Sequence, residues 1–303
     1  WSMSMLYEGN LFVTNLFEFL ELPHTMKILP NDQTTAVPAK LKEGIRFESV
    51  VFSYPDKTER VLDGVSFTLL PGQSVALVGE NGAGKTTIVK LLSRLHDPTE
   101  GRIVVDGIDL KQYDLQAWRE KISVIFQDFC RYHMTARENI GIGKVGAIED
   151  LALVKEAAQR SNAEAVIDKL ADGYETTLGH YYSTRDKGAE LSGGEWQKLG
   201  LARAFMRSNN HGSANMDAQL LILDEPTAAL DAKAEHDVYM RFHELTRGKT
   251  TFLISHRFST VKMADLILVL ENGKIIEQGN HTQLMDKEGE YARLFKLQAD
   301  RYQ

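Results

Sequence analysis

Continuous apolar runs along the chain predict strands buried on both faces, as in a mainly parallel sheet. These runs are residues 75–78, 122–126, 220–223 and 251–254. Residues 266–270 and 274–276 are also strand-like and flank Asn272-Gly273, the dipeptide preferred in two-residue hairpin turns. A further set of strand-like segments predicts a separate antiparallel lobe. Its members are residues 45–52, 65–70 and 103–105.

Helical periodicity replaces the strand pattern between about residues 135 and 170. Leu151, Val154 and Ala158 lie there on one face of a predicted helix. The tail from about residue 281 is also helical and charged, and we expect it to present a solvated face. Strands alternating with helices in this way predict an α/β fold.

The first 43 residues differ from the rest. Apolar side chains crowd residues 11–22, and Pro23 interrupts them. Residues 23–43 contain three prolines and little periodicity, which predicts a linker. We find no apolar run as long as a membrane span and no signal peptide. The chain as given is therefore not expected to cross a membrane.

Composition sets limits on partners and compartment. The 303 residues are 43% hydrophobic, enough for a substantial core. The net charge of −7 gives no electrostatic reason to expect a nucleic-acid partner. Cys130 is the single cysteine, which excludes an intramolecular disulfide framework and is consistent with a reducing compartment.

A phosphate-binding loop follows the run 75–78. Its residues, in the pattern G-x-x-x-x-G-K-[ST], are Gly79, Glu80, Asn81, Gly82, Ala83, Gly84, Lys85 and Thr86. The glycines let the backbone wrap a phosphate and point several N–H groups at it. A helical pattern follows at 88–92, so we expect the phosphates at a helix N-terminus. Lys85 and Thr87 are expected to hold phosphates, and Thr86 to ligate Mg²⁺.

Two carboxylates, Asp224 and Glu225, follow the run 220–223. Ligands of open α/β sheets bind at the carboxyl ends of strands. Asp224 fits the Mg²⁺-holding acid of phosphate-loop NTPases, and Glu225 is placed to polarise an attacking water. Such a pair can also be a helix cap or a solvated turn. The phosphate loop in the same chain favours the catalytic interpretation.

A second anion site is predicted where Ser192, Gly193 and Gly194 open a helix with Ser192 as its N-cap. A capped helix start does not explain two consecutive glycines, which weaken a helix. Their N–H groups form an anion site that has no lysine of its own. One phosphate loop with one spare anion site predicts a split site. Each of two subunits then lends residues 192–194 to the other's nucleotide.

These motifs, in this order, closely resemble the nucleotide-binding domain of ATP-binding cassette (ABC) transporters, over roughly residues 44–300. Tyr54, before Pro55, resembles the aromatic residue that stacks on adenine. Gln127 resembles the glutamine that touches Mg²⁺ and the membrane-domain contact. Residues 229–231 resemble the loop that crosses the dimer interface. His256, after the run 251–254, resembles the histidine that contacts the γ-phosphate, although a lone histidine or aromatic residue is often structural.

The resemblance implies an ABC ATPase fold. This fold is α/β and combines a phosphate-loop NTPase (RecA-like) core, an antiparallel β lobe and a smaller helical lobe. Residues 1–43 are then expected to form a linker from an absent transmembrane domain. Residues 44–127 and 196–303 are expected to form the ATP-binding core with the antiparallel lobe. Residues 128–195 are expected to form the helical subdomain that ends in the signature.

The resemblance also implies hydrolysis of MgATP between two head-to-tail copies, most simply a homodimer. Glu225 orients or deprotonates the water, His256 and Lys85 support the γ-phosphate, and ATP and Mg²⁺ are the expected cofactors. The expected Mg²⁺ ligands are Thr86, Gln127 and Asp224. Dimer closure completes the site. A transmembrane domain of the same polypeptide uses the resulting conformational change to export a substrate that the sequence does not identify.

Two features resemble bacterial exporters in particular. Residues 195–198 read Glu-Trp-Gln-Lys, with Glu195 where glutamine is commoner in the family. Residues 6–22 resemble the join between a last transmembrane helix and the nucleotide domain, which would place the chain at the cytoplasmic face of the cell membrane. An amphipathic helix docked on the domain is the alternative for this segment.

Other users of these motifs fit less well. Chromosome-maintenance ATPases insert long coiled coils between the phosphate loop and the signature, whereas Lys85 and Ser192 are only 107 positions apart. Translation-associated cassette proteins carry two cassettes in one chain. A stand-alone importer ATPase remains the alternative, but it would normally begin near residue 44.

Two further segments lie between these motifs, and the first of them departs from the family. Residues 208–215 form a polar, glycine-containing insertion that predicts a surface loop. Residues 179–190 occupy the place where exporters sense the coupling helices. The candidates for that contact are Tyr181, Tyr182, Arg185 and Glu190.

Overall fold

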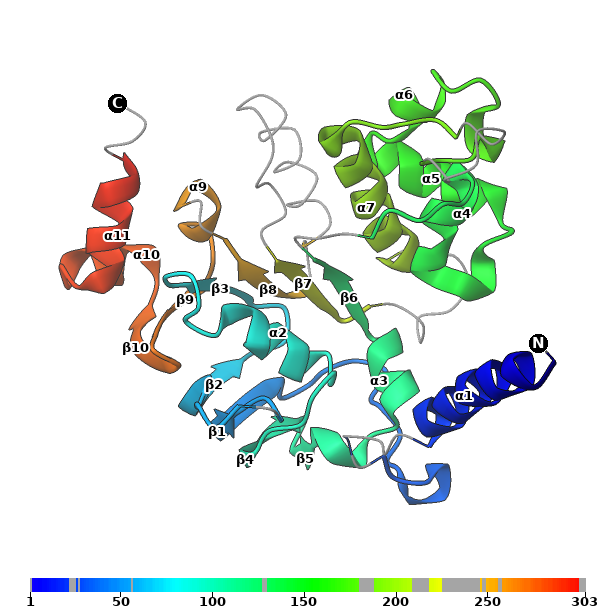
Figure 1. The fold of residues 1–303 in the computed structure, drawn as a ribbon. Helices are drawn as coiled ribbons and strands as arrows, with labels where there is room; N and C mark the ends of the chain where they lie inside the picture. Colours follow the sequence, from blue (N-terminus) through cyan, green and yellow to red (C-terminus); the bar gives the residue numbers. More distant parts are fainter. Residues whose placement is uncertain are drawn as a thin grey trace.

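Two β-sheets form the body of the protein, with a helical lobe beside them (Figure 1). The computed structural model describes residues 2–21, 26, 28–55, 57–126, 130–179, 188–208, 218–224, 246, 249–255 and 258–299. Within these residues the structure confirms the predicted α/β fold.

The larger sheet has six strands in the order β10-β9-β3-β8-β7-β6. They are β3 (Ser74–Val78), β6 (Ile122–Ile125), β7 (Leu220–Asp224), β8 (Thr250–Ile254), β9 (Leu266–Glu271) and β10 (Lys274–Gly279). All neighbours pair in parallel except β9 and β10. Every residue of β7 and β8 is buried, as continuous apolar runs predict. Asn272 and Gly273 both have positive φ, at 46° and 74°, which confirms the predicted hairpin turn.

The smaller sheet confirms the antiparallel lobe and has the order β2-β1-β4-β5. Its strands are β1 (Ile45–Phe52), β2 (Leu62–Leu69), β4 (Glu100–Val105) and β5 (Ile108–Asp109). β4 begins three residues before the predicted segment. Its first three residues are exposed and carry no apolar pattern, but Glu100 and Arg102 still pair with β1.

Two hydrophobic cores lie on opposite faces of the larger sheet. Val75 and Leu77 of β3 face the core that includes the smaller sheet and helix α2 (Lys85–Leu92). Ala76 and Val78 face the core that includes the helical lobe. Successive side chains of a strand point to opposite faces. The end of β3 is therefore fixed between two packed layers.

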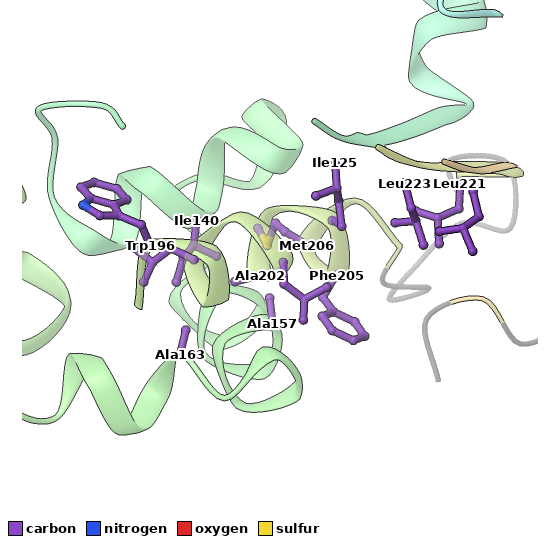
Figure 2. Packing of buried hydrophobic residues seen from close by; sticks show 14 of the residues in the cluster. Ile125, Ile140, Ala157, Ala163, Trp196, Ala202, Phe205, Met206, Leu221 and Leu223 are labelled. Carbon is purple, nitrogen blue, oxygen red and sulfur yellow. The ribbon is translucent and has the colours of Figure 1, made fainter. Parts of the chain in front are cut away.

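The helical lobe confirms the helices expected between residues 135 and 170. It contains α4 (Ala136–Gly141), α5 (Leu151–Ser161), α6 (Glu164–Ile167) and α7 (Gly193–Ser208). Figure 2 shows Trp196, Phe205 and Met206 of α7 packed with residues of α4 and α5. The same cluster continues to Leu221 and Leu223 of β7. Helix α7 therefore connects the start of the signature to the large sheet.

The other α-helices in the described part of the chain are α1 (Ser2–Leu20), α3 (Leu115–Glu120), α9 (Phe258–Val261), α10 (His281–Asp286) and α11 (Glu290–Ala299). The helical tail is confirmed, but its inner face is not solvated, because Leu284 and Tyr291 are fully buried in the core. The side chains of α1 from Met3 to Leu20 are all exposed, so this helix does not dock on the domain as the alternative required. Among the described residues, no helix has both the length and the apolarity of a bilayer span.

The segment after α1 is attached to the domain by side-chain hydrogen bonds. The Gln219 amide accepts from the Leu41 N–H at 2.6 Å and donates to the carbonyl oxygens of Pro38, at 3.1 Å, and Ala39. The Asp106 carboxylate accepts the N–H groups of residues 42–44. The end of the predicted linker therefore has a fixed position on the domain.

Candidate nucleotide site

The phosphate loop connects the end of β3 to the start of α2, as the sequence predicts. Gly79 and Gly84 have φ of 158° and 105°. A Cβ on Gly79 would overlap the Leu270 carbonyl oxygen, and one on Gly84 would lie 2.8 Å from Leu62 Cδ2 and 2.9 Å from Val61 O. Only glycine fits these positions, which lets the loop pack close to the sheet.

Lys85 lies inside this loop. It is 6% exposed, and its ammonium donates to the carbonyl oxygens of Gly79, at 2.8 Å, and Glu80, at 2.9 Å. The next residue, Thr86, is exposed, whereas Thr87 is buried. The charge is thus held against the backbone that would surround a phosphate, and the exposed Thr86 lies in the first turn of the helix.

Asp224 shares the sheet edge from which the loop departs. Leu77 of β3 pairs with Ile254 of β8, and Ile254 pairs with Asp224 of β7. Two strand spacings, about 10 Å, therefore separate Asp224 from the strand that leads into the loop. Asp224 is 4% exposed, so its carboxylate is held inside the domain at this edge. The predicted juxtaposition of acid and loop at one edge is confirmed.

This donor set fits Mg²⁺. The ion prefers oxygen ligands and is usually held by one or two carboxylates together with substrate phosphates. Asp224 is buried and supplies a carboxylate, and Thr86 is exposed and supplies a hydroxyl. No group of three metal-binding side chains occurs among the residues that the structure describes, so a dedicated all-protein cage is not found there.

The signature begins α7 with a capping box, in which the first and fourth residues exchange hydrogen bonds. Ser192 N–H and hydroxyl both donate to the Glu195 carboxylate at 2.8 Å. The Glu195 N–H lies 3.4 Å from the Ser192 hydroxyl oxygen. Gly193 is exposed and Gly194 is half-buried. The predicted N-cap is confirmed, and Glu195 is its reciprocal partner.

Tyr54 follows β1 and lies beside α2. Its hydroxyl oxygen is 3.2 Å from the Lys90 ammonium and 3.3 Å from the Thr87 hydroxyl. Its ring makes edge contacts with Phe52, at 5.0 Å between centroids, and His96, at 5.4 Å. Burial lowers the pKa of His96, and the nearby Lys90 lowers it further. Tyr54 is thus fixed close to the helix that starts in the phosphate loop.

Other expected site residues lie outside the part of the chain that the structure describes. They are Gln127, Glu225, residues 229–231, His256, Tyr181, Tyr182, Arg185 and residues 209–215 of the insertion. Glu190 is described and exposed.

Two neighbours of the site were not predicted from the sequence. Lys90 lies one helical turn after Thr87, and this spacing alone places both on one face of α2. Arg293 of α11 lies 3.4 Å from the Glu80 carboxylate of the phosphate loop, across 213 positions of sequence. No local pattern marks that pair.

Comparisons with known proteins agree with this geometry. A lipid A-core flippase of Chromohalobacter salexigens is 38% identical over 283 residues, which cover 93% of this chain and 45% of the flippase. A putative multidrug export ATP-binding/permease protein of Bacillus subtilis, YgaD, is 39% identical over 284 residues, with the same two coverages. The chain thus spans less than half the length of each of these relatives.

A solved structure and a family match complete the comparison. The structure of a bacterial Atm1-family ABC exporter with ATP bound matches with a TM-score of 0.81 and 33% identity, over 98% of this chain and 49% of that one. Residues 62–228 match the ABC transporter family. This range contains both the phosphate loop and Asp224. The chain therefore belongs to the ABC transporter family, whose ATP-binding domain it carries.

Proposed function

We propose that this chain binds MgATP and hydrolyses it between two head-to-tail copies, and that this reaction drives export by a transmembrane domain of the same polypeptide. The observation that carries the proposal is the sheet edge where the Lys85 loop and the buried Asp224 meet. Ser192 caps a helix in a different lobe. This separation supports a site completed by a second copy.

Each residue is assigned a role on this basis. Tyr54 stacks on adenine, and the loop backbone with Lys85 and Thr87 holds the phosphates. Thr86, Asp224 and Gln127 hold Mg²⁺, which when bound neutralises charge on the phosphate oxygens. In phosphoryl transfer, positioning and electrostatics supply most of the catalysis.

The remaining roles fall on the water, the γ-phosphate and the partner copy. Glu225 orients or deprotonates the attacking water, and His256 supports the γ-phosphate. Residues 192–195 of the partner copy close on the nucleotide.

Export rather than import is supported by the relatives. Their names include a lipid A-core flippase, a multidrug export protein and a subtilin transport protein. Their matches cover 93% or 94% of the chain, so they extend beyond residues 62–228 into the N-terminal segment that an importer ATPase lacks. The names cover chemically different cargoes, so no single substrate class is assigned.

The test is the molar mass of Glu225→Gln by light scattering, with and without MgATP. We expect a monomer alone and a dimer with MgATP, because slow hydrolysis keeps the closed pair. Lys85→Ala is the control and should stay monomeric, since it loses a phosphate contact. If Glu225→Gln binds ATP but stays monomeric, the chain either needs its transmembrane domain in order to pair or pairs with a different subunit. Undiminished turnover in that variant would exclude the assigned role of Glu225.

A further inference from the structure

Lys90 contacts the hydroxyl of Tyr54, whose ring is proposed to stack on adenine. We infer that Lys90 is a positioning residue for adenine. The inference rests on the proposed function, since it concerns how Tyr54 meets ATP. Lys90 lies on α2, outside the phosphate-loop pattern, and its ammonium donates a hydrogen bond of 3.2 Å to the Tyr54 hydroxyl.

The geometry favours this hydrogen bond over a cation–π contact. The ammonium lies 5.2 Å from the ring centroid but only 3.2 Å from the hydroxyl oxygen. It therefore sits at the hydroxyl end of the ring and does not cover its centre. The face of the ring is not used by Lys90.

Two kinds of contact restrict the two side-chain torsions of Tyr54 separately. The hydroxyl lies on the Cβ–Cγ axis, so a hydrogen bond to it limits the first torsion and leaves rotation about that axis free. The edge contacts with Phe52, at an interplanar angle of 81°, and His96, at 89°, limit that rotation. Together they fix one orientation of the ring before the nucleotide binds.

Helix α2 relates this orientation to the phosphates. The Tyr54 hydroxyl also lies 3.3 Å from the hydroxyl of Thr87, which is 5% exposed and sits one turn before Lys90. The helix that starts in the phosphate loop therefore holds the base platform as well. A ligand with phosphates but no base gains nothing from this arrangement.

The rival explanation is that Lys90 attracts the triphosphate as a plain positive charge. The two differ in what the ligand must contain. If Lys90 positions the base, its removal weakens the binding of ATP but not that of inorganic tripolyphosphate. If Lys90 acts as a plain charge, its removal weakens the binding of both.

The experiment is calorimetric titration of the full chain with ATP and with tripolyphosphate. Lys90→Met keeps the length of the side chain and should weaken ATP binding about three- to tenfold, the worth of one hydrogen bond. Tripolyphosphate affinity should change less than twofold. Lys90→Arg should restore most ATP affinity. Tyr54→Phe should weaken ATP binding similarly, and the double variant should lose little more.

Lys155→Met is the matched control, since Lys155 lies 5.8 Å from the Tyr174 ring in the helical lobe and should change neither affinity. Thermal unfolding of each variant checks the fold. Equal weakening of both ligands by Lys90→Met, additive effects of Lys90 and Tyr54, or no effect on ATP would each overturn the inference alone. A wild-type chain that binds no ATP would instead overturn the proposed function on which it rests.

Discussion

The Ser192 hydroxyl donates a hydrogen bond of 2.8 Å to the carboxylate of Glu195 in the first turn of α7. Hydrogen bonds from the backbone and side chain of Ser192 lower the pKa of Glu195, so the carboxylate is ionised at neutral pH. A negative charge therefore stands at the helix start that we propose meets the partner's γ-phosphate. The Glu195 charge stabilises the N-terminus of its own helix, and in the proposed dimer it repels the phosphates bound to the partner copy.

Replacing Glu195 with Gln separates these two effects. The amide oxygen of glutamine still accepts from Ser192, while the charge is removed. In the Glu225→Gln background we expect the MgATP-dependent dimer to tighten about three- to tenfold, since like-charge repulsion across a partly exposed interface is on the order of 1 kcal/mol. Light scattering over a dilution series measures this. An unchanged dissociation constant would mean that Glu195 does not face the nucleotide.

A substitution at Gly193 tests whether this glycine is needed for the fold or for the close approach of the partner's nucleotide. No heavy atom outside its own helix and chain neighbours lies within 4 Å of where its Cβ would stand. Gly193→Ala should therefore leave the melting temperature unchanged or slightly higher, because alanine favours a helix by up to about 1 kcal/mol. We expect ATP turnover to fall at least tenfold, since the added methyl would stand where we propose that the partner's phosphate approaches.

Melting curves and a phosphate-release assay on the same Gly193→Ala preparation check both parts. Normal turnover would show that no phosphate approaches this backbone.

Arg203 connects α7 to α4 and to the segment that precedes α4. Its guanidinium donates to Asn139 O at 2.7 Å, Asn139 Oδ1 at 2.9 Å and Cys130 O at 2.7 Å. Burial lowers the pKa of Arg203, and the three hydrogen bonds compensate for the loss of water around its charge. Arg203→Met leaves them without their donor and should lower the free energy of unfolding by about 2–4 kcal/mol. Urea denaturation measures this.

The control for Arg203 is Arg293→Met, which alters partly exposed ion pairs with Glu290 and Glu80 and should leave the urea midpoint nearly unchanged. Equal midpoints for the Arg203 variant and the wild type would contradict the prediction.

The sequence predicts elements where one pattern dominates. β1 was predicted with its observed limits, because apolar residues mark both ends of Ile45–Phe52. β2 begins at Leu62, three residues early, and β5 was missed because two residues carry no periodicity. Such limits depend on pairing with a neighbouring strand, which a local pattern does not contain.

In the candidate nucleotide site, too, the features with a local sequence pattern could be predicted, and the contacts between distant residues could not. The phosphate loop and the Ser192 cap have local signatures, and the structure agrees with both. Glu195 also stands at the fourth position of a capping-box sequence, which is a local signal for its pairing with Ser192. The contact of Lys90 with Tyr54 spans 36 positions and depends on the packing of β1 against α2. No sequence pattern records that distance.

His96 makes stability depend on pH. Its ring lies 5.4 Å from those of Tyr54 and Phe52, and burial first, then Lys90, lowers its pKa, while Asp97 opposes the shift. The folded state therefore resists a proton that the unfolded chain accepts below the ordinary histidine value of about 6.5. Stability should be full above that pH and should fall as the pH drops toward the folded pKa.

His96→Gln removes the group that binds this proton and should therefore reduce the loss of stability at low pH. Melting temperatures from pH 7.5 to 5.0 test it, because all other titrating groups contribute equally to the two proteins. We expect the wild type to lose more stability than the variant across this range. The difference should arise below about pH 6.5, where the unfolded histidine starts to charge. Parallel curves would mean that His96 has the same proton affinity in both states, and that its contact with Tyr54 does not desolvate it.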